Sequence, residues 1–592
     1  MNTSDNEISI IKDTSFRKII LSLLLFLIIV YYLILLFWNI PYPLFWSDEA
    51  MTVMHSERVL KYGYPKVSDG KNVLYDLLNN DADIGRDKKT DAFIGGSGWL
   101  HYYFAAPFVL IADGFKDFYV KTAIIRAPFA VIGTFGLLLF IFSLLPLFKN
   151  SIEKLLSSII FALLCVFSVP VLLHLREVRY YSLTFFLFGA MIYFFSYHRI
   201  YGRFSKYKYC TALTLILLFL FFTFSPAYFI SLGILGLFEV LNFLFWYYYE
   251  RNFASADQSV QLRKKILESI FYLLPLILSL IILIPFFVFF KTFQMHSTNA
   301  NFDNFSINQY ISNLRLVVGF FLKYELLLPA LIMKLFIIIK TSKMLEIKIP
   351  YLIKHIKLSY CYLIFIAVYI ILICSIDYFP FNRYYIYIQP LISLMLILDF
   401  YLIIIYIRNY YYSKKIKFIT LFTIISCCIF LFHIVRNFNL IEGKLYETFH
   451  RFENTIDYSV KFIADNFEKP DTLIIATNYE EACYDYYLGC KTIIGYVGNN
   501  LKEDLKLNPD IIIVRRNFIK IPLDFLSIAN YYIQQAAYQK IILPCYDDKF
   551  NTIPEIRKDI HHSFRSPRAK KDEERLKVYI RIELLKNKKL KL

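Results

Sequence analysis

Long apolar stretches separated by short charged ones run along the chain as far as about residue 436. The first, from Ile19 to Ile40, follows Arg17 and Lys18 and is long enough to cross the ~30 Å hydrocarbon core of a bilayer. No cleavable signal sequence is apparent, so we expect a transmembrane helix here. Ten further spans are expected near 122–147, 155–173, 181–197, 208–225, 227–249, 267–290, 316–339, 359–376, 384–407 and 417–436. The pattern therefore predicts a polytopic α-helical membrane protein with eleven spans.

The charges between these stretches predict an orientation. Basic residues cluster in alternate loops, for example around residues 199–208, 263–265 and 340–357, whereas the short loops between them hold only isolated ones. Cytoplasmic loops are the ones enriched in lysine and arginine. This places the N-terminus in the cytoplasm and predicts a multi-pass protein of the cell (inner) membrane.

One apolar segment is too short to be a span. Trp99–Ala112 (WLHYYFAAPFVLIA) has well below the ~20 residues that a transmembrane helix needs. Counting it as a span would also invert every later loop. We therefore expect an interfacial helix within a large first extracytoplasmic loop, residues 41–121, inside a transmembrane domain of residues 1–436.

The remaining residues, 437–592, predict a second domain. They are more charged, and short β-rich runs near 472–476, 492–495, 510–514 and 540–543 alternate with helix-like stretches such as 458–466. This alternation indicates a small α/β domain, which an odd number of spans places outside the cell membrane. The basic tail after Arg565 is expected to be solvated or to lie next to the membrane.

Composition excludes several classes of protein. Of 592 residues, 57% are hydrophobic, 19% aromatic and only 19% charged, against about 25% charged in soluble domains. A disordered, fibrous or disulfide-scaffold protein is thus excluded, and the composition argues strongly against a wholly soluble one. The net charge of +18 comes from short clusters that orient spans, not from a continuous basic stripe, so no nucleic-acid partner is expected.

The cysteines and acids predict no metal site. None of the nine cysteines has zinc-site spacing, and only one carboxylate pair stands out. Cys483 and Cys490 would lie outside the membrane, where a disulfide between them is chemically possible. We expect neither a cofactor nor an essential metal.

The first candidate for chemistry follows the first span. The sequence Phe45–Ala50 (FWSDEA) predicts a helix capped by Ser47 that runs to about Lys61, with Asp48 and Glu49 in its first turn. Two acids at a helix N-terminus are explained structurally by the helix dipole. The functional alternative is a general base that takes a proton from an acceptor hydroxyl.

Basic and aromatic residues supply the second candidate. His174–Tyr181 (HLREVRYY) places Arg176 and Arg179 at the outer end of a span, and Arg383 and Tyr384 precede another. Such residues can simply anchor helix ends at the interface. Guanidinium groups also bind phosphate oxygens in a bidentate fork, so an anionic lipid phosphate is the functional alternative. Arg126 opens a further span in the same leaflet.

These motifs, in this order, resemble polytopic glycosyltransferases of the C superfamily. The order is W-S-D-E-A, then W-L-H-Y-Y, I-R-A-P-F-A and H-L-R-E-V-R-Y-Y-S-L, with T-N-Y-E-E and Y-Y-L-G in the outer domain. The nearest branch is the bacterial one related to protein O-mannosyltransferases, the lipid A aminoarabinose transferase and the lipopolysaccharide-core galacturonosyltransferases. Leu175 replaces a residue that is usually small and polar in that branch.

The resemblance implies a sugar donor carried on polyprenyl phosphate and an acceptor that is a glycan, lipid or protein of the cell envelope. It implies that Asp48 is the catalytic base, with Glu49 beside it, and that Arg176 contacts the donor phosphate. Ser97-Gly98 stand where some relatives have Lys-Pro, so another basic residue would replace that lysine. The expected phosphate contacts are Arg176, Arg179, Arg383 and Arg126; the expected substrate contacts are His101, Tyr102, His174, Tyr181 and Tyr384.

The residues leave three other functions open. A polysaccharide polymerase or ligase also uses arginines on a lipid-linked glycan but does not require the acid pair. A lipid-glycan flippase generally places charges within its spans, whereas here nearly all charges sit at span ends. A sensor with an outer binding domain is the non-enzymatic alternative.

Overall fold

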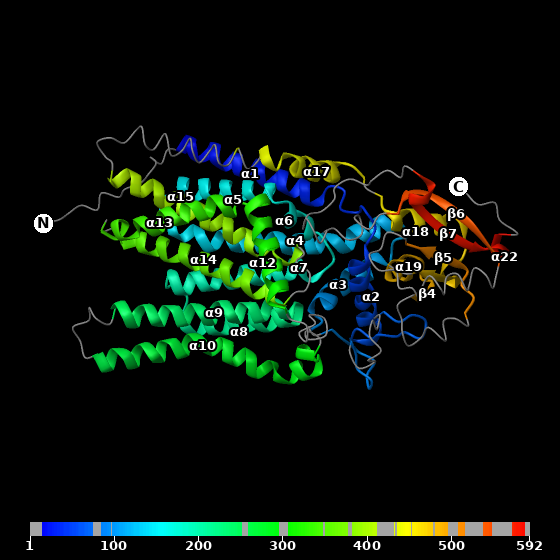
Figure 1. Cartoon of the computed structure of the whole chain (residues 1–592), viewed down its shortest axis with the longest axis horizontal. Coiled ribbons are helices and arrows are strands. Elements are labelled where there is room, and N and C mark those ends of the chain that lie inside the picture. The colour runs from blue at the N-terminus through cyan, green and yellow to red at the C-terminus, as the bar shows by residue number, and fades with distance from the viewer. Residues whose placement is uncertain are drawn as a thin grey trace.

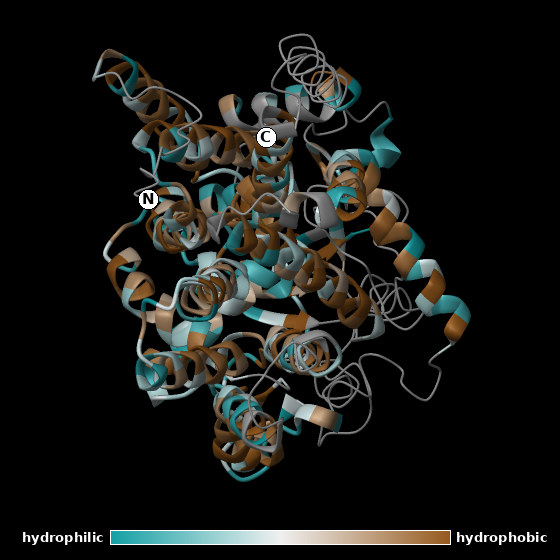
Figure 2. Cartoon of the chain, turned by 90° about the vertical axis from the view of Figure 1, so that its left-hand side faces the viewer, coloured by the Kyte–Doolittle hydropathy of each residue, from teal (hydrophilic) through white to brown (hydrophobic). Residues whose placement is uncertain are grey.

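The computed structural model of the 592-residue chain describes residues 15–74, 85–95, 98–250, 258–294, 306–346, 350–376, 382–410, 431, 435–451, 453–477, 480–494, 507–515, 537–547 and 571–585. Long helices form a bundle, and a mixed α/β domain lies at one end of it (Figure 1). Seen from the opposite end, the helices of the bundle are mostly hydrophobic (Figure 2). This is the polytopic helical class that the apolar pattern predicts.

Eight of the expected spans are single helices. Within the described residues these eight are long and apolar enough to cross a membrane. They are α1 (Ser15–Phe37), α4 (Phe118–Leu144), α7 (Tyr180–Phe195), α8 (Lys206–Thr223), α9 (Ser225–Phe245), α10 (Gln258–Phe289), α14 (Pro350–Ile376) and α15 (Ile388–Tyr410).

The other three expected spans differ. Residues 155–173 form two short helices, α5 (Ser151–Phe167) and α6 (Val169–His174). The break precedes Pro170, which lacks an N–H and clashes with the preceding helical turn. Residues 316–339 form α12 (Ile307–Tyr324) and α13 (Leu327–Glu346), a pair bent by 89°. The span expected at 417–436 lies almost entirely outside the described residues. Within the described residues, which leave out most of the eleventh expected span, the structure thus gives eight spans, or nine with the bent pair.

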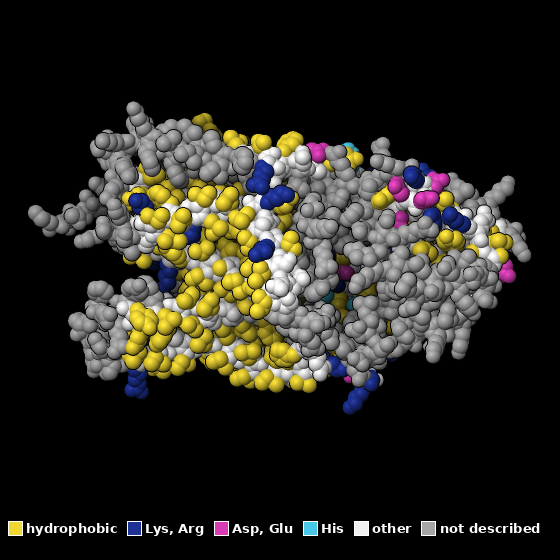
Figure 3. Space-filling view, in the orientation of Figure 1, with side chains coloured by type: hydrophobic (Ala, Val, Ile, Leu, Met, Phe, Trp, Pro, Cys, Tyr) yellow, Lys and Arg dark blue, Asp and Glu magenta, His cyan; other side chains and the backbone are white. Residues whose placement is uncertain are grey.

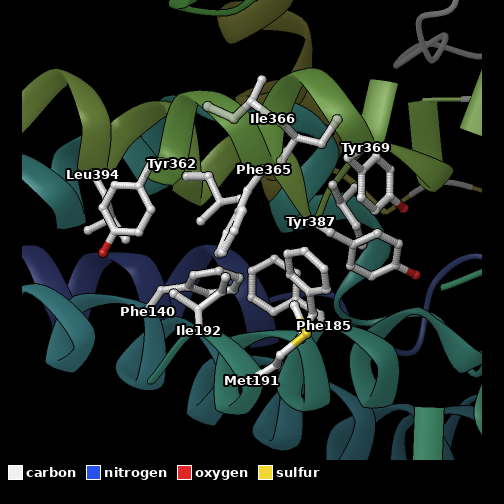
Figure 4. Close-up of a cluster of buried hydrophobic side chains, with 14 of the residues drawn as sticks. Phe140, Phe185, Met191, Ile192, Tyr362, Phe365, Ile366, Tyr369, Tyr387 and Leu394 are labelled. Carbon is white, nitrogen blue, oxygen red and sulfur yellow. The ribbon is translucent and has the colours of Figure 1, made fainter. Parts of the chain in front are cut away.

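Aromatic and aliphatic side chains fill the center of the bundle. Phe140 of α4, Phe185 of α7, Phe365 of α14 and Leu394 of α15 converge in this core (Figure 4). Glycines let α4 and α7 approach closely: a Cβ on Gly189 would come within 2.9 Å of the carbonyl oxygen of Gly136. Small residues at contacting faces are a general device of membrane helix packing.

The first outer loop contains two short helices and a two-stranded sheet. Helix α2 (Ser47–Tyr62) ends at Gly63, whose φ of 80° is the left-handed conformation that glycine adopts readily. Its N-cap is Trp46, with no side-chain cap, so the expected capping by Ser47 is wrong. Strands β1 (Gly85–Arg86) and β2 (Phe93–Ile94) precede α3 (Leu100–Ala112). With 13 residues, α3 confirms the short helix expected at Trp99–Ala112.

The C-terminal α/β domain follows α17 (Phe438–Phe449). Its helices are α18 (Thr455–Asn466), α19 (Glu481–Leu488) and α22 (Ile582–Leu585), and its strands are β3 (Ile474–Thr477), β4 (Lys491–Ile494), β5 (Ile511–Val514), β6 (Tyr538–Tyr546) and β7 (Arg575–Arg581). The sheet order is β4-β3-β5-β7-β6. Strands β3, β4 and β5 are parallel, whereas β7 pairs antiparallel with β5 and β6. The four strands that the sequence predicts are confirmed.

Two details of this domain differ from expectation. Part of the basic tail is strand β7, an interior strand that buries Leu576, Val578 and Ile580. Its pattern RLKVYIR alternates charged and apolar residues, so one face packs on the core although the segment is basic. Cys483 and Cys490 are free buried thiols, so the disulfide left open by the sequence is not formed.

The first outer loop and the C-terminal domain share one hydrophobic core. Phe45 and Val53 of the loop belong to the same buried cluster as Val460, Tyr487 and Val578 of the domain. Helices α2 and α3 accordingly lie between the bundle and this domain (Figure 1). Hydrophobic side chains cover much of the bundle surface in Figure 3, whereas charged side chains of both signs lie over the domain.

Candidate functional site

The C-terminal domain holds the segment that leads into α2. The backbone N–H of Leu44 donates to Asp457 Oδ1 (3.1 Å), and that of Phe45 donates to the hydroxyl of Tyr487 (3.0 Å). The thiol of Cys483 donates to the carbonyl oxygen of Phe45 (3.2 Å). The backbone just before the W-S-D-E-A motif is therefore fixed by side chains more than 400 residues away in the sequence.

Asp48 pairs with Arg179 at the N-terminus of α2. Asp48 Oδ2 lies 3.3 Å from Arg179 Nη2, and Arg179 Nη1 donates to Thr52 Oγ1 at 3.2 Å. The side chains of Asp48 and Arg179 remain 30% and 20% exposed, so a substrate can reach both. A carboxylate and a guanidinium, the groups needed for proton transfer and phosphate binding, thus stand next to each other.

Glu49 has a different environment although it is the next residue. Its two carboxylate oxygens accept from Arg126 Nε (2.8 Å) and Nη2 (2.5 Å), and Oε1 also accepts from the backbone N–H of Val178 (3.0 Å). Arg126 Nη1 donates to the carbonyl oxygens of Ile40 and Pro43. Glu49 and Arg126 are both buried. This ion pair joins α2, α4 and the turn between α6 and α7, and it occupies both groups.

Arg383 approaches the site from η6 (Asn382–Tyr384), a turn that packs against α6. Its guanidinium carbon lies 5.3 Å from the ring centroid of Trp46 and 5.4 Å from that of Tyr384. Trp46 is two residues before Asp48, so the structure brings Arg383 to the same end of the bundle as Asp48 and Arg179. Arg176 lies in the same turn as Arg179 and is half-buried.

The remaining residues that were expected to contact substrate are connected by contacts between their rings. Tyr180 contacts His101 and Tyr181 and stacks on Phe224, which in turn stacks on Tyr384. His101 lies against Tyr102, with 3.9 Å between ring centroids. His174 is fully buried and its Nδ1 lies 3.1 Å from Glu177 Oε1. All of the expected residues are thus found at this end of the molecule.

Sequence reasoning missed Thr52 and His55. Both follow Asp48 on one face of α2, at the helical spacing i, i+4 and i+7, and both are buried. Burial, together with the charges of Arg58 and Arg179, lowers the pKa of His55 to about 3. That spacing is present in the sequence, but a threonine and a histidine on one helix face do not by themselves predict a site.

A metal centre is not apparent in the part of the chain that the structure describes. No group of three or more His, Cys, Asp or Glu side chains there could hold a metal ion. The expectation that the reaction needs no metal stays a prediction.

Comparison with known proteins identifies the fold. The crystal structure of ArnT from Cupriavidus metallidurans in the apo state matches with a TM-score of 0.52 and 10% identity, over 94% of this chain and 98% of that one. ArnT bound to undecaprenyl phosphate matches over the same shares with a TM-score of 0.50 and 12% identity. No family model matches the sequence, and no curated protein does either. Over almost its whole length, the chain therefore has a fold similar to that of ArnT.

Proposed function

We propose that this protein is an integral-membrane glycosyltransferase that moves a sugar from a polyprenyl-phosphate donor to a hydroxyl group of a cell-envelope acceptor. The observation that carries the proposal is the reachable Asp48–Arg179 pair, in a fold shared with ArnT. The solved ArnT complex contains undecaprenyl phosphate, the kind of leaving group that the proposal requires. The site then faces the extracytoplasmic side, as the distribution of basic loops predicts.

In the proposed reaction Asp48 is the general base. Its carboxylate takes the proton of the acceptor hydroxyl, and the acceptor oxygen attacks the anomeric carbon of the donor sugar. The bond between that carbon and the phosphate oxygen breaks, and polyprenyl phosphate leaves with the electron pair. Attack opposite the leaving group inverts the anomeric centre.

Arginines stabilise the leaving phosphate in this proposal. Arg179 exchanges its contact with Asp48 for the phosphate, which frees the carboxylate to act as a base, and Arg383 lies on the Trp46 side of the same site. Glu49 and Arg126 are assigned a positioning role instead, because each already binds the other. The sequence-based expectation allowed Glu49 to take part in catalysis and Arg126 to bind the donor phosphate. The proposal restricts both residues to positioning α2.

The experiment is an assay of the purified full-length protein with a radiolabelled polyprenyl-phosphate sugar and a cell-envelope extract as acceptor. We expect free polyprenyl phosphate to appear only when acceptor is present. Asp48→Asn should lower the rate by about 10²–10⁴-fold, the usual contribution of a general base. Asp113→Asn, which alters an exposed acid of the same loop, is the matched control and should keep the wild-type rate.

Two results would contradict the proposal. Full activity of Asp48→Asn would remove the assigned base. Movement of the intact sugar lipid across a vesicle membrane, without cleavage, would identify a flippase instead.

A further inference from the structure

Two buried histidines, one on α2 and one on α3, have ring nitrogens that form no hydrogen bond with the described residues. His55 of α2 is 1% exposed and His101 of α3 is 4% exposed. None of their four ring nitrogens has a hydrogen-bond partner within the residues that the structure describes. Buried polar atoms are nearly always paired in folded proteins, so four unpaired atoms in two neighbouring rings call for an explanation.

Ring contacts hold both imidazoles in place. His55 stacks on Phe93, with 4.6 Å between centroids, and lies 4.8 Å from Tyr102. His101 also contacts Tyr102, with 3.9 Å between ring centroids. It meets Tyr180 edge to face, with 5.9 Å between ring centroids. The aromatic rings thus set the positions of both imidazoles, while the ring nitrogens make no hydrogen bond within the described residues.

The two rings adjoin the Asp48–Arg179 pair. His55 follows Asp48 and Thr52 on one face of α2, and Arg179 binds both of those residues. The guanidinium carbon of Arg179 lies 5.4 Å from the ring centroid of Tyr180, the ring that His101 also contacts. Both imidazoles therefore lie beside the Asp48–Arg179 pair.

Both imidazoles are neutral at physiological pH. Burial and the charges of Arg58 and Arg179 lower the pKa of His55 to about 3. Burial and the charge of Arg179 lower the pKa of His101 well below its usual value. A neutral imidazole has one donor and one acceptor nitrogen, which matches a hydroxyl group that both donates and accepts. An anionic phosphate is matched better by the arginines.

We propose that His55 and His101 form a subsite that binds hydroxyl groups of the sugar on the lipid-linked donor. The subsite rests on the proposed function, and it assigns the sugar to the imidazoles and the phosphate to the arginines. The class of ligand is a neutral sugar ring with free hydroxyls. His55 and His101 then determine which sugar the protein accepts.

The test measures binding by the full-length protein in lipid nanodiscs. The probes are undecaprenyl phosphate without a sugar and the same lipid phosphate carrying glucose, mannose or galactose. We expect at least one sugar lipid to bind more tightly than the sugar-free lipid. His55→Phe and His101→Phe should each weaken that binding about tenfold, equivalent to about 1.4 kcal/mol, and change the Kd of the sugar-free lipid less than about twofold. His450→Phe, an exposed histidine outside the site, is the control and should bind all probes like the wild type.

Thermal unfolding of the same variants separates binding from structure. Phenylalanine keeps the ring contacts and removes unpaired nitrogens, so the Tm of both variants should equal or exceed that of the wild type. A lower Tm would mean that the nitrogens support the fold, and the subsite would be refuted.

The outcomes for the subsite and for the proposed function differ. If the wild type binds undecaprenyl phosphate but favours no sugar lipid, or if the variants keep the preference, the subsite is wrong and the transferase proposal stands. If the wild type binds none of the four probes, the proposed function itself fails.

Discussion

At the scale of single residues, Asp48 and Glu49 are chemically alike but have opposite environments. Successive residues of a helix point about 100° apart, so one carboxylate can face a substrate while the next faces the protein interior. The Asp48 side chain is 30% exposed, whereas Glu49 is fully buried against Arg126. Removing one partner of a buried ion pair leaves an uncompensated charge, which is costly.

We therefore expect Glu49→Ala and Asp48→Ala to affect stability very differently. Glu49→Ala should lower the free energy of unfolding by about 3–5 kcal/mol because it leaves Arg126 buried and unpaired. Asp48→Ala, the matched control, should change it by no more than about 1 kcal/mol because its ion pair is partly exposed. Denaturant unfolding in detergent measures both. Equal losses for the two variants would contradict the assigned roles.

The sequence indicated the residues of this site but not their pairing. Asp48, Arg179, Arg383 and His101 stand out as acids, bases and aromatics near span ends. Glu49 binds Arg126, which is 77 residues further along the chain. This pairing depends on how α2 packs on α4, and a local sequence pattern does not predict that packing. His55 was missed for a related reason, since its significance lies in the hydrogen bonds that it does not make.

At the scale of elements, α2 is positioned from both sides. The Glu49–Arg126 pair connects it to the bundle, and Asp457, Cys483 and Tyr487 fix the backbone just before it. The hydroxyl of Tyr487 also lies 2.6 Å from Thr122 Oγ1 of α4. The C-terminal domain thus helps to position Asp48, whether or not the domain also contacts the acceptor.

Tyr487→Phe should loosen the start of α2. Without the hydroxyl, the amide of Phe45 loses its acceptor, and hydrogen exchange across residues 44–50 should become about fivefold faster, as expected for a hydrogen bond worth about 1 kcal/mol. Exchange in β3 and β5 should not change. Tyr538→Phe, which removes a hydroxyl bound to Pro509 within the domain, is the control and should leave residues 44–50 unchanged. Unaltered exchange in Tyr487→Phe would refute this role.

The same interface should make stability depend on pH. Burial raises the pKa of Asp457 to about 6, although three hydrogen bonds to its carboxylate oppose that shift. The folded protein therefore keeps a proton that the unfolded chain loses near pH 4, so this stabilisation is complete below about pH 4 and declines as the pH rises to 6 and above.

Asp457→Asn isolates this contribution. The amide cannot titrate, so the fall in Tm between pH 5 and pH 7.5 should be smaller in the variant than in the wild type, even if the variant is less stable at every pH. Thermal unfolding at the two pH values measures the difference. An identical pH dependence in both proteins would contradict the raised pKa.

The apolar pattern predicted most elements, and its failures have physical causes. Eight spans, α3 and four strands lie where the sequence placed them. The span expected at 155–173 is broken before Pro170, and the 89° bend between α12 and α13 is a feature that a hydropathy pattern does not record. Strand β7 was not predicted because the basic residues of this segment indicated a solvated tail. The alternating apolar positions Leu576, Val578 and Ile580 were the signal for a strand.

At the scale of the whole molecule, the site lies where three parts meet. The end of the helical bundle supplies Arg179 and Arg383, the first outer loop supplies Asp48 and both buried histidines, and the C-terminal domain holds the loop in place (Figure 1). One hydrophobic core runs through the loop and the domain, so they are expected to unfold together. Eight of the described helices are long and apolar enough to anchor this assembly in a membrane.

The most direct test of the account is an experimental structure of the full-length protein with undecaprenyl phosphate. We expect the phosphate group at the end of the bundle that carries α2, with its oxygens about 3 Å from the guanidinium of Arg179 or Arg383. The Asp48 carboxylate should face the position of the anomeric carbon. A phosphate bound at the opposite end of the bundle, or bound while both arginines keep their present contacts, would contradict the central claim.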